Sequence, residues 1–408
     1  MERFPLLWFR AFLSRLSSPI FRIPCLRSRR VLKNQHLHRA TYLTMSSSPP
    51  SSIKAITISA PKKAEITTVP LPRLRDDYIL VRTTAVGLNP TDWKSIDGLA
   101  GTNVAGCRVG CDYAGIVQEV GSAVTKPFKK GDRICGVAHG VNQGVTEDGA
   151  FAEYIVVKGD IAIKIPDNLS DEQAAGLGIG ITTVGQGLYQ ALGLPLPKSP
   201  SSQPTPILIN GGSTATGMLG IQFAKLSGYR VLTTCSSRNA DYVRSLGADD
   251  VIDYREYSDP EKFAAKVHEI LGGDDKLELV WDCIGLPESA KLVVPAISKR
   301  GGKYRSLLTV PDEVVHGIND KVDSSWTFAY FVFGEKFTKG RGTFEARPED
   351  MKFGQMFWDL SRDLLASGKL KVPRQEVNRG GKGLEGVLKG LDELRQDKVS
   401  GVKLIYTL

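Results

Sequence analysis

Residues 207–228 read ILINGGSTATGMLGIQFAKLSG, and this stretch decides the fold. It opens with three apolar residues, a run typical of a strand buried in a parallel sheet. Gly211 and Gly212 permit a sharp turn, after which apolar residues recur with helical spacing. We expect Gly217 and Gly220 to let the first helical turns pass close to a ligand and to the strand. Because free N–H groups and the positive end of the helix dipole attract anions, this unit predicts a pyrophosphate site; a tight turn without a ligand is the alternative.

Further short apolar runs follow at intervals filled by helix-like segments. They are RVLTTC (230–235), VIDY (251–254), LVWDC (279–283) and KYRSLL (303–308). This alternation of strands and helices predicts a doubly wound parallel sheet of the α/β class.

The end of the second predicted strand indicates which nicotinamide cofactor the site takes. A site selective for NAD needs an Asp or Glu there to hold the ribose 2′-hydroxyl, but residues 235–239 read CSSRN and contain no acid. Hydroxyl groups and a guanidinium suit a 2′-phosphate instead, since Arg binds phosphate through a forked pair of hydrogen bonds. We therefore predict NADPH, with Ser236, Ser237, Arg238 and Asn239 around the 2′-phosphate. The alternative for Arg238 is a solvated cation at the start of a helix.

The residues upstream of this region show short alternating runs separated by Gly, Pro and Asp. The runs are IKAITIS (53–59), YILVRTTAVGL (78–88), YAGIVQEVG (113–121), DRICGVA (132–138), FAEYIVV (151–157) and IAIKIP (161–166). This pattern is typical of a largely antiparallel β-rich domain. Helix signals begin at Ser170, an N-cap with acids in the first turn, and the chain ends in a predicted helix (383–396) and strand (401–408).

Composition and charge narrow the class of protein. With 408 residues, 41% of them apolar, the chain is long enough to bury two cores. The formal charge is +9, but residues 1–44 hold eight Arg and one Lys against a single acid, which leaves +1 for the rest and argues against a nucleic-acid-binding protein. The six cysteines, at positions 25, 107, 111, 135, 235 and 283, form no CxxC pair. They predict reduced, mostly structural thiols of an intracellular protein.

Residues 1–44 form a leader that is rich in Arg, Leu, Phe and Ser and poor in acids, as mitochondrial transit peptides are. The alternative is an upstream start in the gene, because Met45 begins a Ser/Pro-rich linker directly before the predicted folded body. No apolar stretch of the leader is long enough to span a bilayer. We expect no stable membrane insertion, and a cytoplasmic location or, if the leader is a genuine transit peptide, a mitochondrial one.

Four ordered motifs in the β-rich region carry a resemblance to a known superfamily. They are GLNPTD (87–92), GCDYAG (110–115), GDRI (131–134) and GAFAEY (149–154). With the dinucleotide-binding pattern and the C-terminal return, they resemble the medium-chain dehydrogenase/reductase superfamily over residues 53–408. Within it, GGSTATG (211–217), TDWK (91–94) and CSSRN (235–239) look most like the fungal trans-acting enoyl reductases.

The resemblance implies a fold, a cofactor and an activity. It implies a GroES-like β-rich catalytic domain (residues 53–180 with 330–408) and a Rossmann domain that binds NADPH (residues 181–329), after a leader and linker (residues 1–52). Enzymes of this group stand alone, use NADPH and reduce the double bond of an acyl intermediate carried by a polyketide synthase without its own working reductase. The implied partners are therefore an acyl thioester and a polyketide synthase of secondary metabolism. The oligomeric state, monomer or homodimer, stays open.

The resemblance also predicts that no zinc ion is bound. Zinc alcohol dehydrogenases of the superfamily place a Cys ligand after the Gly of the first motif and a His–Glu pair after the Gly of the second. Here those places read LN (88–89) and CD (111–112), the four-Cys structural zinc lobe is absent from residues 131–154, and His139 is more typical of a turn residue. Without a metal to polarise a carbonyl, the natural chemistry is conjugate reduction. Hydride goes to the β-carbon, hydrogen-bond donors stabilise the enolate, and the α-carbon takes a proton from water or a side chain.

Three residues are the catalytic candidates. Lys94 ends the TDWK motif, in a loop that the resemblance brings against the nicotinamide end of the cofactor, where it would donate to the substrate carbonyl or to the cofactor ribose. Thr182 and Thr183 lie at the start of the long helix that links the domains in this superfamily, where a hydroxyl would bind the nicotinamide carboxamide or the substrate carbonyl. An exposed loop lysine and helix-capping threonines are the alternatives. Asn89 and Asp92 are expected to brace the loop rather than react.

The family pattern transfers further cofactor contacts to this chain. Residues 213–217 would surround the pyrophosphate, and Tyr254 would either flank the adenine or pack on the sheet. The superfamily's usual Gly-Gly-Val-Gly run becomes TATG (214–217), so hydroxyls replace glycines, as in the fungal enoyl-reductase subgroup. The complete predicted cofactor set is Thr91, Asp92, Trp93, Lys94, Ser213, Thr214, Ala215, Thr216, Gly217, Ser236, Ser237, Arg238, Asn239, Tyr254, Leu307, Leu308, Val399 and Ser400.

An aromatic segment, residues 326–334 (WTFAYFVFG), allows two interpretations. It is either a buried strand or oligomer edge, or a wall of the acyl pocket.

Two other functions of the whole protein also stay open. One is a quinone or enone reductase that acts on small free substrates, and the other is a non-catalytic NADPH-binding protein.

Overall fold

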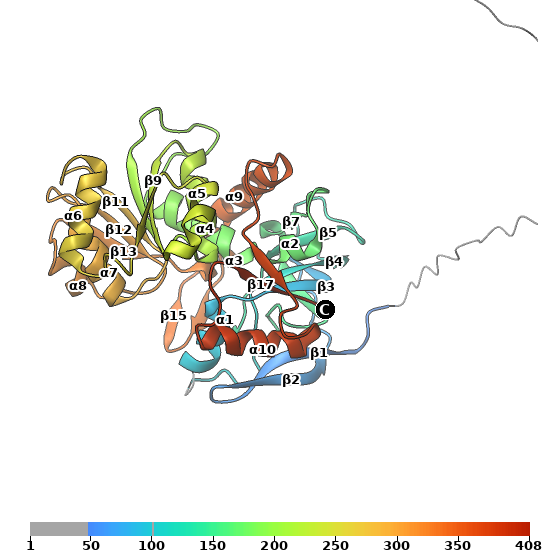
Figure 1. Cartoon of the computed structure of the whole chain (residues 1–408). Helices are drawn as coiled ribbons and strands as arrows, with labels where there is room; N and C mark the ends of the chain where they lie inside the picture. Colours follow the sequence, from blue (N-terminus) through green and yellow to red (C-terminus); the bar gives the residue numbers. More distant parts are fainter. Residues whose placement is uncertain (1–47, 100–101) are drawn as a thin grey trace, which may run out of the picture. The chain divides into compact units, whose positions relative to one another are not determined.

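The computed structural model describes residues 48–99 and 102–408, in a fold of two large sheets and two hairpins with helices packed around them (Figure 1). The predicted leader lies outside the described residues, so the choice between a transit peptide and an upstream start stays a prediction. In the part of the chain that the structure describes, no helix is both long and apolar enough to cross a membrane.

A six-stranded sheet forms the nucleotide-binding half that the sequence predicted. All of its strands are parallel, in the order β10-β9-β8-β11-β12-β13. Their bounds are β8 Pro206–Asn210, β9 Arg230–Cys235, β10 Asp250–Asp253, β11 Leu279–Asp282, β12 Gly302–Ser306 and β13 Val322–Trp326. The direction of winding reverses between β8 and β11, and in such sheets ligands bind at the carboxyl ends of the strands on either side of this reversal.

Helices cover both faces of this sheet, which confirms the doubly wound class (Figure 1). Alternate side chains of β8 explain the two layers: Ile207 and Ile209 face one core, and Leu208 faces the other. The helices are α4 Ala215–Leu226, α5 Ala240–Ser245, α6 Pro260–Leu271, α7 Pro287–Val293 and α8 Asp312–His316. Residues of α4 pack in the first core, and residues of α6 and α7 pack in the second.

The second sheet is largely antiparallel and belongs to the predicted β-rich part. Its order is β16-β17-β3-β4-β5-β7, with β6 paired to β3, and only β16 and β17 run parallel. The bounds are β3 Tyr78–Gly87, β4 Asp112–Val120, β5 Arg133–Val137, β6 Tyr154–Lys158, β7 Ile163–Lys164, β16 Gln375–Val377 and β17 Lys403–Thr407. The predicted last strand is therefore present, and its pairing with β3 brings the end of the chain back to the first domain.

Helices and hairpins complete this half. The helices are α1 Pro90–Gly98, α2 Asp171–Ala175, α3 Gly178–Val184 continued by a π-helical stretch at Gly185–Ala191, α9 Pro348–Ala366 and α10 Gly383–Arg395. The hairpins are β1 Ser52–Ala60 with β2 Lys63–Pro70, and β14 Phe337–Lys339 with β15 Gly342–Phe344. Single helical turns lie at Gly159–Ile161 and Ala329–Phe333, and two more, Ser237–Asn239 and Val294–Ala296, lie in the half with the parallel sheet. Ser170 caps α2 as predicted, since its hydroxyl accepts a hydrogen bond from the N–H of Gln173.

Several elements were not predicted from the sequence, among them β2, β13 and α9. Strand β2 is charged at its start and has little buried surface, because it is an outer strand whose one partner is β1. Strand β13 is mostly exposed and polar, and it forms because it extends the parallel sheet beside β12. Helix α9 buries its apolar face against α3, and it continues the core that spans the two halves.

Candidate active site

The glycine-rich turn after β8 has the backbone geometry that the sequence predicted. Gly211 has a positive φ of 80°, and an added Cβ at Gly217 would overlap the carbonyl oxygen of Gly211. The Thr214 hydroxyl caps α4, because it accepts from the N–H of Gly217 at 3.0 Å and donates to the Gly211 carbonyl at 2.8 Å. Gly220 lets α4 pack closely on β11, since a Cβ there would overlap the Trp281 ring.

This turn leaves backbone donors free at the start of α4. Among the described residues, no hydrogen bond uses the N–H groups of Ser213, Ala215 or Thr216. All three residues are partly exposed, and the helix that follows them has 12 residues. Because the turn lies at the reversal of winding between β8 and β11, it fits a pyrophosphate. The Thr214 hydroxyl already caps α4. It would therefore shape the turn around an anion rather than donate a hydrogen bond to the anion.

The turn after β9 divides the predicted 2′-phosphate residues into two pairs. Ser236 and Asn239 are buried, and the Asn239 side-chain amide lies 3.4 Å from the Ser236 hydroxyl and 3.3 Å from the Ser400 hydroxyl. Ser237 and Arg238 are exposed. The exposed pair is therefore free to meet a phosphate, and the buried pair shapes the turn and joins it to the C-terminal return.

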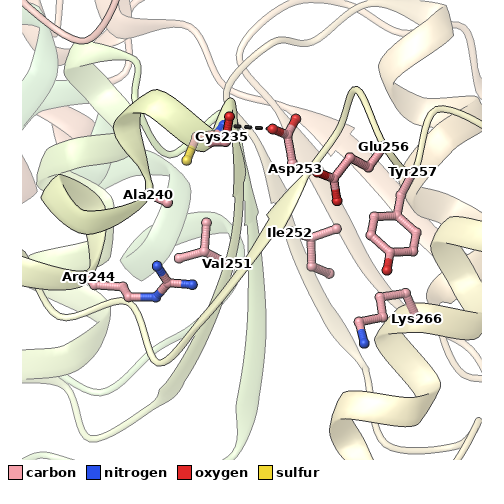
Figure 2. A pocket seen from close by; sticks show the side chains of 10 residues that line it. Cys235, Ala240, Arg244, Val251, Ile252, Asp253, Glu256, Tyr257 and Lys266 are labelled. Atoms are coloured by element: carbon pink, nitrogen blue, oxygen red, sulfur yellow. Dashed lines mark hydrogen bonds between the residues drawn. The ribbon is translucent and has the colours of Figure 1, made fainter.

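Asp253, at the end of β10, also shapes this turn, and sequence reasoning missed it. Its Oδ2 atom accepts a hydrogen bond from the Ser237 N–H at 2.7 Å (Figure 2). Burial alone would raise the pKa of Asp253, but hydrogen bonds from the backbone N–H groups of Arg255 and Ser237 outweigh it and lower that pKa, so the carboxylate stays charged. The one available signal was the acid in VIDY, which the parallel pairing of Asp253 with Cys235 brings beside the turn.

An open pocket of about 300 Å³ lies beside this turn, at the β10 edge of the sheet (Figure 2). Its lining residues are Cys235, Ser237, Ala240, Arg244, Val251, Ile252, Asp253, Glu256, Tyr257 and Lys266. Of the residues predicted to bind the cofactor, this pocket reaches only Ser237, so it borders the predicted site without containing it.

The remaining predicted contacts of the parallel sheet lie at its carboxyl edge. Tyr254 directly follows β10 and is exposed. Leu307 and Leu308 directly follow β12; Leu308 is exposed, and Gly285 after β11 packs against its backbone. Val399 and Ser400 precede β17, and Ser400 reaches the turn after β9 through Asn239.

Helix α1 presents the TDWK motif in two directions. Lys94 is exposed, lies 5.8 Å from the ring centroid of Trp93, and has its pKa lowered by partial desolvation. Asp92 is buried and braces the loop as predicted, because its Oδ2 atom accepts from the Asn89 N–H at 2.7 Å. Burial raises the pKa of Asp92 to about 7. Lys94 is thus the member of the motif whose charge is accessible.

Helix α3 separates the roles of the two candidate threonines. The Thr182 hydroxyl accepts a hydrogen bond from Trp358 Nε1 at 3.2 Å, which ties it to α9. The Thr183 hydroxyl has no hydrogen-bond partner among the described residues, although this residue too is buried. Thr183 is therefore the threonine whose hydroxyl is free for a ligand.

Comparisons with known proteins agree with this architecture. Residues 75–167 match the alcohol dehydrogenase GroES-like domain, and residues 215–305 match the zinc-binding dehydrogenase family. The chain is 52% identical over 305 residues to the trans-enoyl reductase TOXD of Cochliobolus carbonum, which covers 74% of this chain and 98% of that protein. The chain belongs to the trans-enoyl reductase family. It is an oxidoreductase that acts on carbon–carbon double bonds.

Two further comparisons extend this result. The trans-enoyl reductase resD of Aspergillus sclerotiorum is 44% identical over 373 residues, which cover 87% of this chain and 99% of that protein. A mycobacterial protein solved in complex with NADPH shares the fold with a TM-score of 0.67 at 20% identity, covering 88% of this chain and 99% of that one. The predicted superfamily and the GroES-like plus Rossmann fold are thus confirmed.

At the places where zinc relatives hold their ligands, this trans-enoyl reductase has groups that are already engaged with one another. The Cys111 thiol lies 3.5 Å from the Tyr330 hydroxyl, and burial raises its pKa far above the ordinary range. Asn89 and Asp112 are bound to the ammonium of Lys403. Within residues 48–99 and 102–408, no three His, Cys, Asp or Glu side chains are grouped so that they could hold a metal ion. A protonated thiol and an amide that already accepts a hydrogen bond do not fit a zinc ion.

The aromatic segment of the trans-enoyl reductase is a turn rather than a continuous strand. Trp326 ends β13, Ala329–Phe333 forms one helical turn, and Tyr330 is buried with its hydroxyl 3.2 Å from that of Thr91. The rings form one cluster with the β14–β15 hairpin, and its members are Trp326, Phe328, Tyr330, Phe331, Phe337 and Phe344. The cluster therefore adjoins the helix that carries Lys94.

Two polar residues lie inside this aromatic region and were not assigned to it from the sequence. His139 stacks on Tyr330 and Phe333 at centroid distances of 4.7 and 4.9 Å, and burial lowers its pKa well below the ordinary value. Lys339 donates to the carbonyls of Gly140 and Val141 at 2.6 and 3.2 Å, and burial lowers its pKa to about 8. His139 is thus a buried loop residue of the aromatic cluster.

Proposed function

We propose that this enzyme uses NADPH to reduce the α,β double bond of an acyl thioester that a polyketide synthase presents to it. The observation that carries this proposal is the 52% identity to a trans-enoyl reductase over 98% of that protein's length. The site supports it, because the dinucleotide turn and the free threonine belong to elements that share one core, and a hydrogen bond between Thr91 and Tyr330 joins the helix of the accessible lysine to that core.

The residues at the carboxyl edge of the parallel sheet fit NADPH. The free N–H groups of Ser213, Ala215 and Thr216 would hold the pyrophosphate at the start of α4. Ser237 and Arg238 would hold the 2′-phosphate, and no acid lies among residues 235–239 to select NAD. Asp253 fixes the N–H of Ser237 and would keep this turn in position.

The chemistry of the reduction divides between cofactor and protein. When bound, NADPH supplies a hydride for the β-carbon of the conjugated alkene. Negative charge then develops on the thioester carbonyl, and Lys94 and Thr183 would stabilise it by donating hydrogen bonds. Partial desolvation lowers the pKa of Lys94, which makes its ammonium a stronger hydrogen-bond donor. The α-carbon would take its proton from water or from a side chain.

We also propose that this chemistry needs no zinc. The donor set supports this, because the Cys111 thiol is engaged with Tyr330, and Asn89 and Asp112 are engaged with Lys403.

The aromatic cluster beside α1 would form an apolar wall for the acyl chain, and Tyr330 would anchor this wall through Thr91.

The proposed division of the chain keeps a leader and linker at 1–52, a catalytic part at 53–180 with 330–408, and a nucleotide-binding part at 181–329. The pairing of β17 with β3 supports the assignment of the C-terminal return to the catalytic part.

A fusion of residues 1–52 to a fluorescent protein tests the leader: mitochondrial import supports a transit peptide, and a cytoplasmic signal contradicts it.

Turnover by the purified full chain tests the function. NADPH and NADH oxidation are followed with a crotonyl-type thioester and, separately, with a simple quinone. We expect turnover of the thioester with a strong preference for NADPH and little turnover of the quinone. Turnover of the quinone alone would assign the enzyme to small free substrates instead, and no turnover of any activated alkene would leave a protein that only binds the cofactor.

A further inference from the structure

Lys403, in the last strand, is a buried cation with two fixed partners. Its side chain is 3% exposed, and its ammonium lies 2.7 Å from Asp112 Oδ2 and 2.5 Å from Asn89 Oδ1. The Asp112 side chain is fully buried. An ammonium is costly to bury unless it is paired and hydrogen-bonded, so this arrangement constrains the geometry around it strongly.

Two glycines line the path of the Lys403 side chain to these partners. An added Cβ at Gly87 would meet Lys403 Cε at 3.1 Å, and one at Gly176 would meet Lys403 Cγ at 3.2 Å. The pairing of Ile405 with Gly87 brings β17 alongside this path. The structure therefore leaves room for one extended lysine stem and little else.

One partner, Asn89, sets the start of the helix that carries Lys94. It precedes α1, its N–H donates to Asp92 Oδ2 at 2.7 Å, and its carbonyl accepts from the Asp92 N–H at 3.0 Å. These bonds fix the backbone of the first turn, and the ammonium of Lys403 fixes the Asn89 side chain. The direction in which α1 leaves β3 thus depends on Lys403.

The other partner, Asp112, sets the start of the helix that carries Thr183. Its Oδ1 atom accepts a hydrogen bond from the Ile179 N–H at 2.7 Å, one of the N–H groups that a helix start leaves free. Its Oδ2 atom accepts from Lys403. A single ammonium therefore links the two helices that present the proposed hydrogen-bond donors.

We propose that Lys403 is a positioning residue, which sets the helix of Lys94 and the helix of Thr183 at the spacing that enoyl reduction requires. The inference rests on the proposed function, because the two donors must converge on one carbonyl. A displacement of about 1 Å between groups that act together is enough to lower a rate about 100-fold. Because its side chain is buried and its ammonium is already paired, Lys403 itself would touch neither reactant.

The test is Lys403→Met, which keeps the stem and removes the ammonium. We expect the rate of thioester reduction at saturation to fall at least 30-fold, and the dissociation constant for NADPH, from its fluorescence, to change less than threefold. Hydrogen–deuterium exchange gives a readout without turnover: peptides from residues 88–99 and 176–184 should exchange at least tenfold faster than in the parent. A parental rate, or unchanged exchange in both peptides, would overturn the proposal.

Lys158→Met is the matched control, because Lys158 is also a buried lysine, with its ammonium 2.5 Å from carboxylate oxygens of Asp77 and Glu335. We expect it to lose a comparable amount of stability but to keep the exchange of residues 88–99 and 176–184. If Lys158→Met raises exchange in these two peptides as much as Lys403→Met does, the effect is general loosening and the proposal fails.

The double variant Lys403→Met with Asp112→Asn keeps the proposal testable if the single variant does not fold. It removes the uncompensated carboxylate but keeps an oxygen for the Ile179 N–H. We expect it to fold, to protect residues 176–184, to exchange faster at 88–99 and to reduce slowly. A parental rate would overturn the proposal. If the parent itself reduced no enoyl thioester, the proposed function would fail, and the exchange comparison would still decide whether Lys403 links the two helices.

Discussion

At the scale of single residues, Lys94 has the most direct consequence for catalysis. It is the exposed member of the TDWK motif, and we assign to it the developing charge on the carbonyl. Removing one donor to such a charge typically costs 10²- to 10³-fold in rate. We expect Lys94→Met to lose about this much in kcat with little change in NADPH affinity. The exposed Lys262→Met on α6 is the control, and equal losses in both variants would refute the assignment.

The two neighbouring threonines provide a pair of matched variants. Thr182 accepts from Trp358 Nε1, and Thr183 has no hydrogen-bond partner among the described residues. We therefore expect Thr182→Val to lower the free energy of unfolding by about 1 kcal/mol and to spare kcat. Thr183→Val should keep stability and lower kcat about tenfold or more. Chemical denaturation measures the stability of both variants, and steady-state kinetics measures their kcat. A loss of kcat in Thr182→Val and a loss of stability in Thr183→Val would contradict the assignment.

The carboxyl group of Asp92 makes the folding stability depend on pH. The pKa of Asp92 is raised to about 7, from an ordinary value near 3.8, and burial is the largest cause. The nearby Asp112 acts in the same direction, whereas the hydrogen bond from the Asn89 N–H and the charge of Lys403 lower this pKa. Between these two values the unfolded chain has lost the proton and the folded chain still holds it, so folding stability falls as the pH rises from about 4 to 7. A pKa that differs by one between the folded and unfolded chain corresponds to roughly 1.4 kcal/mol.

Asp92→Asn removes this dependence on pH. We expect the stability of the variant relative to the parent to improve from pH 5 to about pH 7, by an amount on the order of 1–3 kcal/mol, and to level off above that pH. Any loss of hydrogen bonding adds a constant offset and leaves the trend. Denaturant titrations at four pH values measure it, and a stability difference that is constant with pH would contradict the raised pKa.

At the scale of elements, the turn after β9 determines the expected cofactor preference. Arg238 and Ser237 are exposed there, and Asp253 fixes the backbone between them and the sheet. We expect Arg238→Gln to raise the KM for NADPH about tenfold or more and to leave the KM for NADH unchanged, because only the 2′-phosphate is lost as a partner. Parallel kinetics with both cofactors provide the test. An equal change for NADPH and NADH would mean that Arg238 acts elsewhere.

The elements that could be predicted from the sequence are those with a local signal. The strand, glycine turn and helix from β8 to α4 appear in order, because three apolar residues and two glycines act within a few positions. Strand β13 could not be predicted, since its polar residues become a strand only when the edge of β12 is already there. The helical turn of the aromatic segment could not be predicted for a related reason: its rings pack against a hairpin that lies later in the chain.

At the scale of the whole molecule, the candidate site depends on contacts between distant segments. The motifs predicted Lys94 and residues 213–217 and 236–239, because each of them lies in a recognisable sequence pattern. Lys403 has none, and it is 314 residues from Asn89 and 291 from Asp112. Tyr330, 239 residues from Thr91, was likewise seen only as part of an aromatic run. The pairs of Lys403 form only when β17 returns to β3, and the pair of Tyr330 forms only when its helical turn packs beside α1.

The proposed function requires that hydride from NADPH reaches the β-carbon of a conjugated thioester. The most direct measurement is reduction of a crotonyl-type thioester by the full chain with NADPH carrying deuterium at C4, using each of the two labelled epimers. We predict that one epimer gives a saturated product with a single deuterium on the β-carbon, as read by mass spectrometry and NMR. Deuterium on the carbonyl carbon, or a saturated product without label from either epimer, would contradict the claim.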